Sequence, residues 1–125
     1  MRTVVSTKAA PNPVGPYSQA VKANGFIFAS GQIPLDPATL QIVPGGIVEQ
    51  TVRTLRNVSG LLEAAGSDMS KIVRCVVYLK TMGDFAAMNK TYAKFFGENP
   101  PPRTTAEAAH LPKDALIEIE VTAIE

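Results

Sequence analysis

Apolar residues recur at helical spacing in the middle of the chain. They lie three and four positions apart and form one stripe that comprises Val48, Val52, Leu55, Val58, Leu62 and Ala65. We expect the opposite side, which carries Gln50, Arg53, Arg56 and Glu63, to face solvent. Gly66 follows where a left-handed C-terminal cap is usual. The pattern predicts an amphipathic helix that ends near Ala65.

A second, shorter helical pattern begins at about Asp84, a residue type suited to an N-cap. The side chains expected to point inward are Phe85, Met88, Tyr92 and Phe95 or Phe96. Gly97 ends the pattern, and prolines at 100–102 prevent the helix from continuing. The sequence therefore predicts two helices.

Segments with β-strand patterns surround these helices. They cover residues 3–6, 17–22, 26–31, 72–80, 103–108 and 116–124. Asn24-Gly25 predicts a type I′ hairpin between the second and third segments. In the fourth segment, one predicted face carries Val73, Cys75, Val77 and Leu79, and the other carries Val76 and Tyr78. The last segment alternates between apolar residues from Ile117 onwards and a set that contains Glu118 and Glu120.

Two helices among five or six strands predict an α+β fold: one sheet with both helices on the same face. We expect one domain over residues 1–125. The other face would carry apolar side chains in a monomer, namely Phe26, Phe28, Val76, Tyr78 and Leu116. Because an exposed sheet face should be mostly polar, we expect copies of the chain to bury these faces together in a homo-oligomer.

Composition and charge narrow the class of protein. Hydrophobic residues make up 46% of the chain and charged residues 18%, which is typical of a globular protein. Twelve basic residues balance eleven acidic ones and form no run, so we expect neither nucleic-acid nor membrane binding. The lone cysteine, Cys75, excludes an internal disulfide and fits a reducing compartment. With no signal-peptide pattern and no long apolar run, a cytoplasmic location is expected.

Candidate chemistry begins with the two glutamates of the last strand. Glu118 and Glu120 point to the face expected to be buried between copies. A partly desolvated carboxylate has a raised pKa and suits general acid–base catalysis. The alternative is that both lie at a solvated rim of the sheet without a catalytic role.

Arg103 follows the three prolines at the start of a strand, where its guanidinium would suit binding of a substrate carboxylate. A surface ion pair is the alternative. The Tyr17 hydroxyl and the backbone at Ser30-Gly31 are candidate ligand contacts, although a core tyrosine and a β-bulge explain them as well.

Other kinds of site are disfavoured. A single histidine, His110, provides no metal site and should lie at the surface. Cys75 in the middle of a strand is expected to be a buried structural residue and not a nucleophile. No glycine-rich phosphate-binding loop is present.

Several motifs resemble the RidA/YjgF family. They are Gly15-Pro16-Tyr17-Ser18-Gln19-Ala20, Ser30-Gly31-Gln32-Ile33-Pro34, Asn57 to Gly66, Asp84-Phe85 through Met88-Asn89 to Tyr92, Pro102-Arg103, and Leu111-Pro112-Lys113-Asp114 with Ile117-Glu118-Ile119-Glu120. The closing motif is the most specific of them. The matches keep their order from about Ala10 to the C-terminus, so the resemblance covers nearly the whole chain.

The resemblance implies a chorismate-mutase-like homotrimer with ligand pockets between subunits. It implies hydrolysis of 2-aminoacrylate and related imines, such as 2-iminopropanoate and 2-iminobutanoate, to 2-oxo acids and ammonia, without a metal or cofactor. By position, Arg103 is similar to the arginine that holds the substrate carboxylate, and Glu118 to the glutamate that positions water. Pocket positions of the family fall on Tyr17, Ser30, Gly31 and Asn89. Thr105 stands where many members have cysteine, which questions any role for a thiol there.

Two other functions stay open at this point. Some family members have been described as ribonucleases or translation inhibitors, although the balanced charge of this chain disfavours tight RNA binding. A non-catalytic ligand-binding or chaperone-like trimer is the other alternative, and retention of both Arg103 and Glu118 argues against it. Whether Glu118 or Glu120 faces the reacting atom is also open, because a bulge would change the strand register.

Overall fold

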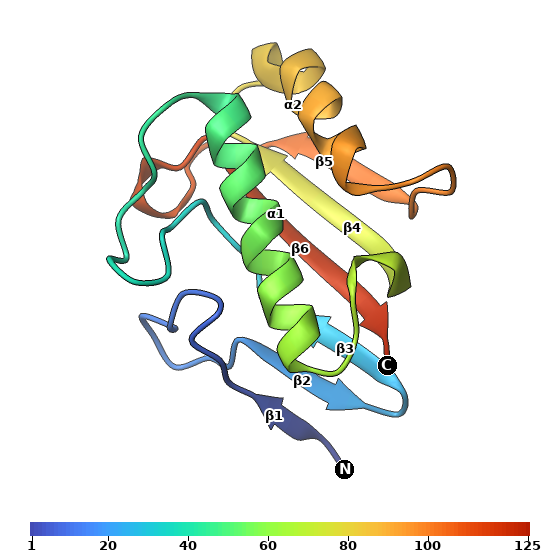
Figure 1. Cartoon of the computed structure of the whole chain (residues 1–125). Coiled ribbons are helices and arrows are strands. Elements are labelled where there is room, and N and C mark those ends of the chain that lie inside the picture. The colour runs from blue at the N-terminus through green and yellow to red at the C-terminus, as the bar shows by residue number, and fades with distance from the viewer.

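A computed structural model describes residues 1–125 and contains one six-stranded sheet (Figure 1). The strands are β1 (Thr3–Val5), β2 (Ala20–Ala23), β3 (Phe26–Ala29), β4 (Ile72–Leu79), β5 (Arg103–Glu107) and β6 (Ile117–Ile124). They are arranged in the order β1-β2-β3-β6-β4-β5. Neighbouring strands are antiparallel except β4 and β5, which are parallel. The chain passes between these two through helix α2 (Phe85–Tyr92), because parallel neighbours need a crossover connection.

The predicted hairpin joins β2 to β3. Asn24 has a φ of 52° and Gly25 a φ of 81°, and a type I′ turn requires positive φ at both central positions. The expected order of strands and helices along the chain is confirmed, with strand ends that differ by a few residues.

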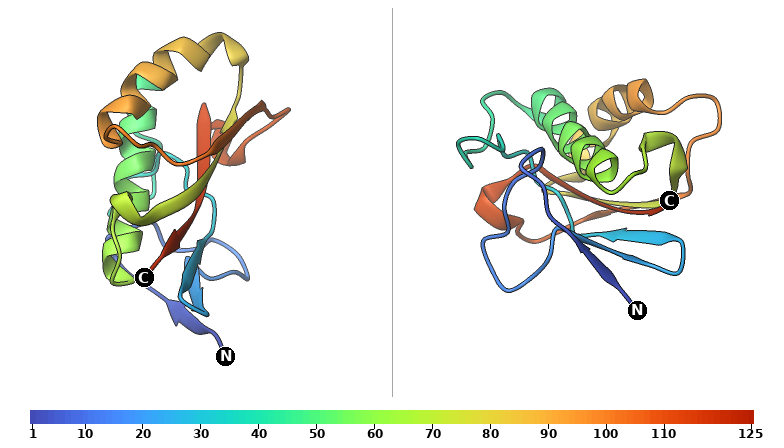
Figure 2. Two further views of the ribbon diagram at one scale, coloured as in Figure 1. Left: turned by 90° about the vertical axis from the view of Figure 1, so that its right-hand side faces the viewer. Right: turned by 60° about the horizontal axis from the view of Figure 1, so that its bottom comes forward.

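Both helices lie on the same face of the sheet, as predicted (Figure 2). Helix α1 (Ile47–Ala64) crosses the middle of the sheet and packs on β6, while α2 lies beside it toward β4 and β5 (Figure 1). The core contains the predicted apolar set of β6, which is Ile117, Ile119, Val121 and Ala123, together with Leu55, Val58, Leu61 and Leu62 of α1. The observed architecture is therefore the mixed α+β sheet with two helices on one face that the sequence predicts.

The buried side of α1 differs from the predicted stripe at its first turn. Val48 is exposed, whereas Gln50, expected in solvent, is only 6% exposed. The reason is a polar contact: the Gln50 side-chain Oε1 accepts a hydrogen bond of 2.8 Å from the backbone N–H of Leu116. Here α1 faces the backbone N–H of Leu116, just before β6. A glutamine side chain can accept a hydrogen bond from this buried group, and a valine side chain cannot.

A bulge corrects the predicted faces of β4. The pairing of β4 with β6 shifts register between Ile72 and Arg74, so Val73 is exposed and Ile72 is buried. Beyond the bulge, Cys75, Val77 and Leu79 face the core as predicted. An extra residue in one strand explains why strict alternation fails at this point.

Large apolar side chains are exposed on the sheet away from the helices. Phe26 is 39% and Phe28 47% exposed, and Val4 and Ile124 are exposed beside them. The expectation that Val76, Tyr78 and Leu116 are also exposed in a single copy is wrong, because Val76 is buried at 9% exposure and Tyr78 and Leu116 are half-buried. None of the helices is long and apolar enough to cross a membrane.

Candidate active site

Arg103 is the first residue of β5 and lies opposite Cys75 in the parallel pairing with β4. Cys75 is fully buried in the core beneath the helices. Because directly paired residues project to the same face of a sheet, the Arg103 side chain extends toward α2. Arg103, which follows the three prolines, therefore projects to the helix-covered face of the sheet.

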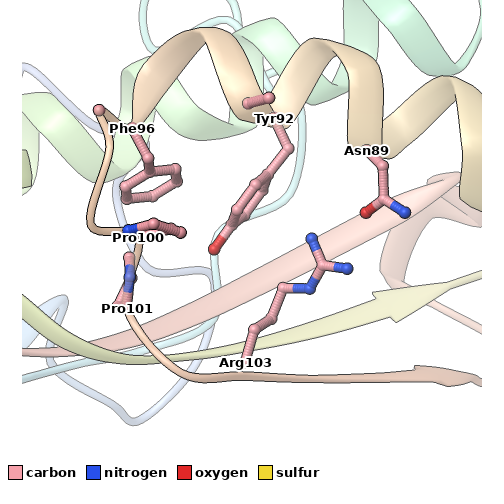
Figure 3. A pocket seen from close by; sticks show the side chains of 8 residues that line it. Asn89, Tyr92, Phe96, Pro100, Pro101 and Arg103 are labelled. Atoms are coloured by element: carbon pink, nitrogen blue, oxygen red, sulfur yellow. The ribbon is translucent and has the colours of Figure 1, made fainter.

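Aromatic rings surround the guanidinium group of Arg103. Its Cζ atom lies 4.8 Å from the centre of the Tyr92 ring and 5.7 Å from that of the Phe85 ring. Figure 3 shows Asn89 on the same side of α2, with its amide directed toward the guanidinium. A cavity of about 470 Å³ adjoins this group and is lined by Asn89, Tyr92, Ala93, Phe96, Gly97, Pro100, Pro101 and Arg103.

Arg103 has no acidic partner. The two ion pairs of the chain are Lys22–Glu125 and Lys80–Asp114, and both lie elsewhere. A half-buried arginine without a carboxylate keeps its planar set of N–H donors for a ligand. The alternative interpretation of Arg103, a surface ion pair, is thus not what this structure shows.

A small group of buried polar atoms lies under the arginine. The Tyr92 hydroxyl and the Thr105 Oγ1 are buried and have no hydrogen-bond partner. Burial raises the pKa of Tyr92 above its usual range, and the adjacent Cys75 adds to the effect. Burial likewise raises the pKa of the Cys75 thiol. Both groups are therefore neutral near pH 7, as expected for a structural cysteine.

Glu118 lies on the opposite face of the sheet from Arg103. It pairs with Tyr78 across β4 and β6, and its neighbours Ile117 and Ile119 face the core. The carboxylate rests against Gly31, where a Cβ would lie within 3.0 Å of the Glu118 Cδ and collide with the carboxylate oxygen. Gly31 is held there because its neighbour Gln32 exchanges two backbone hydrogen bonds with Ile119, of 2.8 and 3.0 Å. A Cβ at position 31 would therefore displace the Glu118 carboxylate from the place it occupies here.

The surroundings of Glu118 favour a protonatable carboxylate. Burial raises the pKa of Glu118, and the negative charge of Glu120 raises it further. Glu120 accepts a hydrogen bond of 3.0 Å from the Tyr78 hydroxyl, whereas the Glu118 carboxylate lines a cavity of about 220 Å³ with Tyr17 and Gly31. Of the two candidate glutamates, Glu118 is the one that faces a cavity.

Buried amides hold the irregular segments that form the walls of this second cavity. Gln19 accepts a hydrogen bond from the backbone N–H of Thr7 and donates to the carbonyls of Thr7, Ala10 and Pro11. Asn57 of α1 donates to the carbonyls of Ile33 (3.1 Å) and Leu35 (2.9 Å). Gln19, Ile33 and Leu35 all line the cavity. Sequence reasoning assigned no such role to these amides.

The predicted site residues thus fall into two groups. Asn89 lies beside Arg103, and Thr105 projects to the same helix-covered face. Tyr17, Gly31 and Glu118 line the second cavity. Ser30 adjoins Gly31, but its hydroxyl is engaged, because it donates a hydrogen bond of 2.7 Å to the Ser18 carbonyl.

The two groups are far apart within one chain. Glu118 pairs with Tyr78 and Tyr78 with Ala106, three residues from Arg103 on β5. Two strand spacings and three residues along the strand place the two Cα atoms roughly 14 Å apart, with side chains on opposite faces. The structure therefore does not bring Arg103 and Glu118 together in one copy of the chain.

Comparison with known proteins decides the family. The model of the family described as endoribonuclease L-PSP matches residues 7–125, nearly the whole chain. The chain belongs to the RidA/YjgF family. The resemblance found in the sequence motifs is confirmed.

Relatives of this RidA/YjgF chain carry different names. A RutC family protein of Pyrococcus horikoshii is 52% identical over 123 residues, covering 98% of each chain. The 2-iminobutanoate/2-iminopropanoate deaminase of Capra hircus is 42% identical over 125 residues, covering all of this chain and 91% of the goat protein. Among solved structures, Escherichia coli TdcF with bound serine superposes with a TM-score of 0.94 at 36% identity, covering 98% of each chain. The fold is thus that of the RidA/YjgF family.

The aromatic surroundings of Arg103 were only partly expected in this family member. Tyr92 was predicted as a core residue, which its 5% exposure confirms, but its contact with Arg103 was not foreseen. Phe85 was predicted to point inward and is 36% exposed, because it lies at the rim beside the guanidinium. The spacing of Phe85, Asn89 and Tyr92 on one helix side was a signal that these residues share a surface.

Proposed function

We propose that the chain hydrolyses small imine and enamine carboxylates, such as 2-iminopropanoate and 2-iminobutanoate, to 2-oxo acids and ammonia. The observation that carries the proposal is the Arg103 guanidinium, which borders a cavity and has no acidic partner. Such a group binds a carboxylate through two parallel hydrogen bonds. The name of the goat relative, an imine deaminase at 42% identity, supports this substrate class.

Glu118 is the proposed general base. The enamine tautomerises to the imine, whose nitrogen takes a proton from solvent. Glu118 takes a proton from water as the water oxygen bonds to the imine carbon, and the C=N electron pair moves to nitrogen to give the amine of a carbinolamine. Glu118 or solvent then protonates this amine. The hydroxyl loses its proton to solvent as the C=O bond forms, and the carbon–nitrogen bond breaks to release ammonia. The raised pKa of Glu118 supports the role because it brings the carboxylate nearer to the operating pH.

The working site is proposed to lie between two copies of the chain. Since Arg103 and Glu118 project from opposite faces of one sheet, a single copy does not present both to one small molecule. The exposed apolar face with Phe26 and Phe28 supports association of copies. We propose a homotrimer in which Arg103, Asn89 and Thr105 of one copy meet Tyr17, Ser30, Gly31 and Glu118 of the next.

The test is a coupled assay in which serine or threonine dehydratase generates the imine and 2-oxo acid formation is followed. We expect the purified chain to accelerate formation, and Arg103→Ala to remove at least 90% of the acceleration, since a lost charged hydrogen bond costs about 1.5–3 kcal/mol. Arg56→Ala, at an exposed arginine of α1, is the matched control and should remain active.

An Arg103→Ala variant with normal activity would refute the carboxylate-binding role. Absence of acceleration with imines from several amino acids would refute the deaminase itself. Cleavage of RNA by the same preparation, lost in neither variant, would instead favour the activity for which the family model is named.

A further inference from the structure

We infer that Phe85 and Tyr92 are positioning residues that hold Arg103 by the flat faces of their rings and so fix the direction of its N–H donors. The inference rests on the proposed function in that the held guanidinium binds the substrate carboxylate. The two residues act through Arg103 and are not required to touch the reacting atoms.

The spacing on α2 places the rings above the arginine. Phe85, Asn89, Tyr92 and Phe96 are separated by four, three and four residues, so they follow one side of the helix and its short 3-10 extension at Ala93–Phe95. Figure 3 shows Asn89, Tyr92 and Phe96 projecting from this side toward the strand that carries Arg103. Arg103 extends from below into the layer that these side chains form.

The ring contacts hold the guanidinium without using its hydrogen bonds. Both centroid distances, 4.8 Å to Tyr92 and 5.7 Å to Phe85, fall within the range of cation–π attraction. A carboxylate partner would fix the group equally well, but it would occupy the donors and neutralise the charge. Aromatic rings restrict the side chain and leave its donor edge for a ligand, which is a form of preorganisation.

Tyr92 is itself held firmly. It is 5% exposed, and its ring packs on that of Phe96 with centroids 4.6 Å apart and planes inclined by 34°. Its buried hydroxyl has no hydrogen-bond partner, so the ring and not the hydroxyl accounts for the contact with Arg103. Phe85, in contrast, is 36% exposed and lies over the arginine from the rim.

The experiment compares Phe85→Leu and Tyr92→Leu with Tyr92→Phe, which keeps the ring. We expect each leucine variant to raise KM for the imine about fivefold to tenfold with kcat changed less than twofold, because a weakened carboxylate contact affects ground and transition states alike. Tyr92→Phe should restore a KM within twofold of the parent chain. Phe95→Leu, at a half-buried aromatic that does not line the Arg103 cavity, is the matched control.

A second readout does not depend on turnover. The Nε–Hε NMR signal of Arg103, assigned by its loss in Arg103→Ala, should show restricted motion in the parent chain and Tyr92→Phe and increased motion in Phe85→Leu and Tyr92→Leu. Binding of 2-oxobutanoate, the expected product of 2-iminobutanoate hydrolysis, should weaken in parallel. Leucine variants that fold normally and leave both the motion and the 2-oxobutanoate affinity unchanged would overturn the inference. If the parent chain binds 2-oxobutanoate through a rigid Arg103 but hydrolyses no imine, the proposed function fails and the positioning role stands.

Discussion

At the scale of single residues, the surroundings of Arg103 and Glu118 affect these two proposed site residues differently. Arg103 keeps its N–H donors free for a ligand because no acidic group is paired with it. Glu118 is made easier to protonate by burial and by the charge of Glu120. The Glu118 carboxylate is close to Gly31, so its environment depends on the absence of a side chain at that position. One group is thus fixed for binding and the other is adjusted for proton transfer.

The pH dependence of activity follows from the raised pKa of Glu118. The carboxylate form is the base, so kcat/KM should fall as the pH is lowered through this raised pKa, at a higher pH than for an ordinary glutamate. Glu120→Gln removes the neighbouring negative charge, which lowers the pKa of Glu118 and should move the acidic limb to lower pH. The pH profile of kcat/KM for both proteins measures this shift.

Tyr78→Phe provides the control for that profile, because it removes the hydroxyl that donates to Glu120 while leaving both glutamate side chains in place. The acidic limb of this variant should stay within about 0.3 pH units of the parent profile, because the variant does not remove a charge near Glu118. A shift of that size corresponds to only about 0.4 kcal/mol. A limb that moves with Tyr78→Phe but not with Glu120→Gln would assign the base to another group.

At the scale of elements, three buried amides join the regular elements to the irregular segments around Glu118. Gln50 holds the start of β6, Gln19 holds the N-terminal loop, and Asn57 holds the loop after β3. Each satisfies backbone groups that no strand or helix satisfies. The walls of the Glu118 cavity are therefore fixed from within the protein.

Replacing Asn57 should loosen one of these walls. Asn57→Ala leaves the Leu35 carbonyl without its donor and removes one of the two donors to the Ile33 carbonyl, which keeps the Leu35 N–H. We expect a loss of about 1–3 kcal/mol in the free energy of unfolding. Denaturant unfolding measures the loss. Arg53→Ala removes only the Nε–H that donates to the other end of the same amide and should cost clearly less. Equal costs for the two variants would contradict the role assigned to the loop contacts.

The elements also show what the sequence could and could not predict. The alternation from Ile117 to Ala123 identified the core face of β6 because each residue of a regular strand changes sides. The shift at Val73 was not predictable from alternation, since a bulge depends on the partner strand. Gln50 was misplaced for a related reason: its burial depends on an unpaired backbone group far along the chain. Residue type and strand position singled out Arg103 and the pair Glu118 and Glu120, alternation placed Glu118 on the face away from the helices, and the motif resemblance favoured Glu118 of the pair. The position of Arg103 on the helix-covered face needed the pairing of β5 with β4.

At the scale of the whole molecule, the position of the two half-sites restricts how copies can assemble. A site that combines opposite faces of the sheet requires different surfaces of two copies to meet, which is a heterologous contact. Such contacts repeat around a ring when the rotation closes. The proposed trimer satisfies this condition, whereas an isologous dimer that buries the Phe28 face against itself does not.

Mixing two inactive variants tests this arrangement. Arg103→Ala and Glu118→Gln should each be inactive alone, but trimers refolded from an equal mixture should regain about a quarter of the parent activity, because one contact in four unites an intact Arg103 with an intact Glu118. The coupled imine assay measures the recovery. If the mixture stays inactive while mass spectrometry shows mixed trimers, the site is not shared between copies.

The separation of Arg103 and Glu118 on one sheet also has a consequence for how activity appears after synthesis. In the proposed trimer, copies that join one at a time would complete one site with the second copy and two more when the third closes the ring. A single folded chain would then have no activity, and two of the three sites would form only in the last step of assembly. Activity regained after dilution and reconcentration should therefore lag behind the recovery of folded structure.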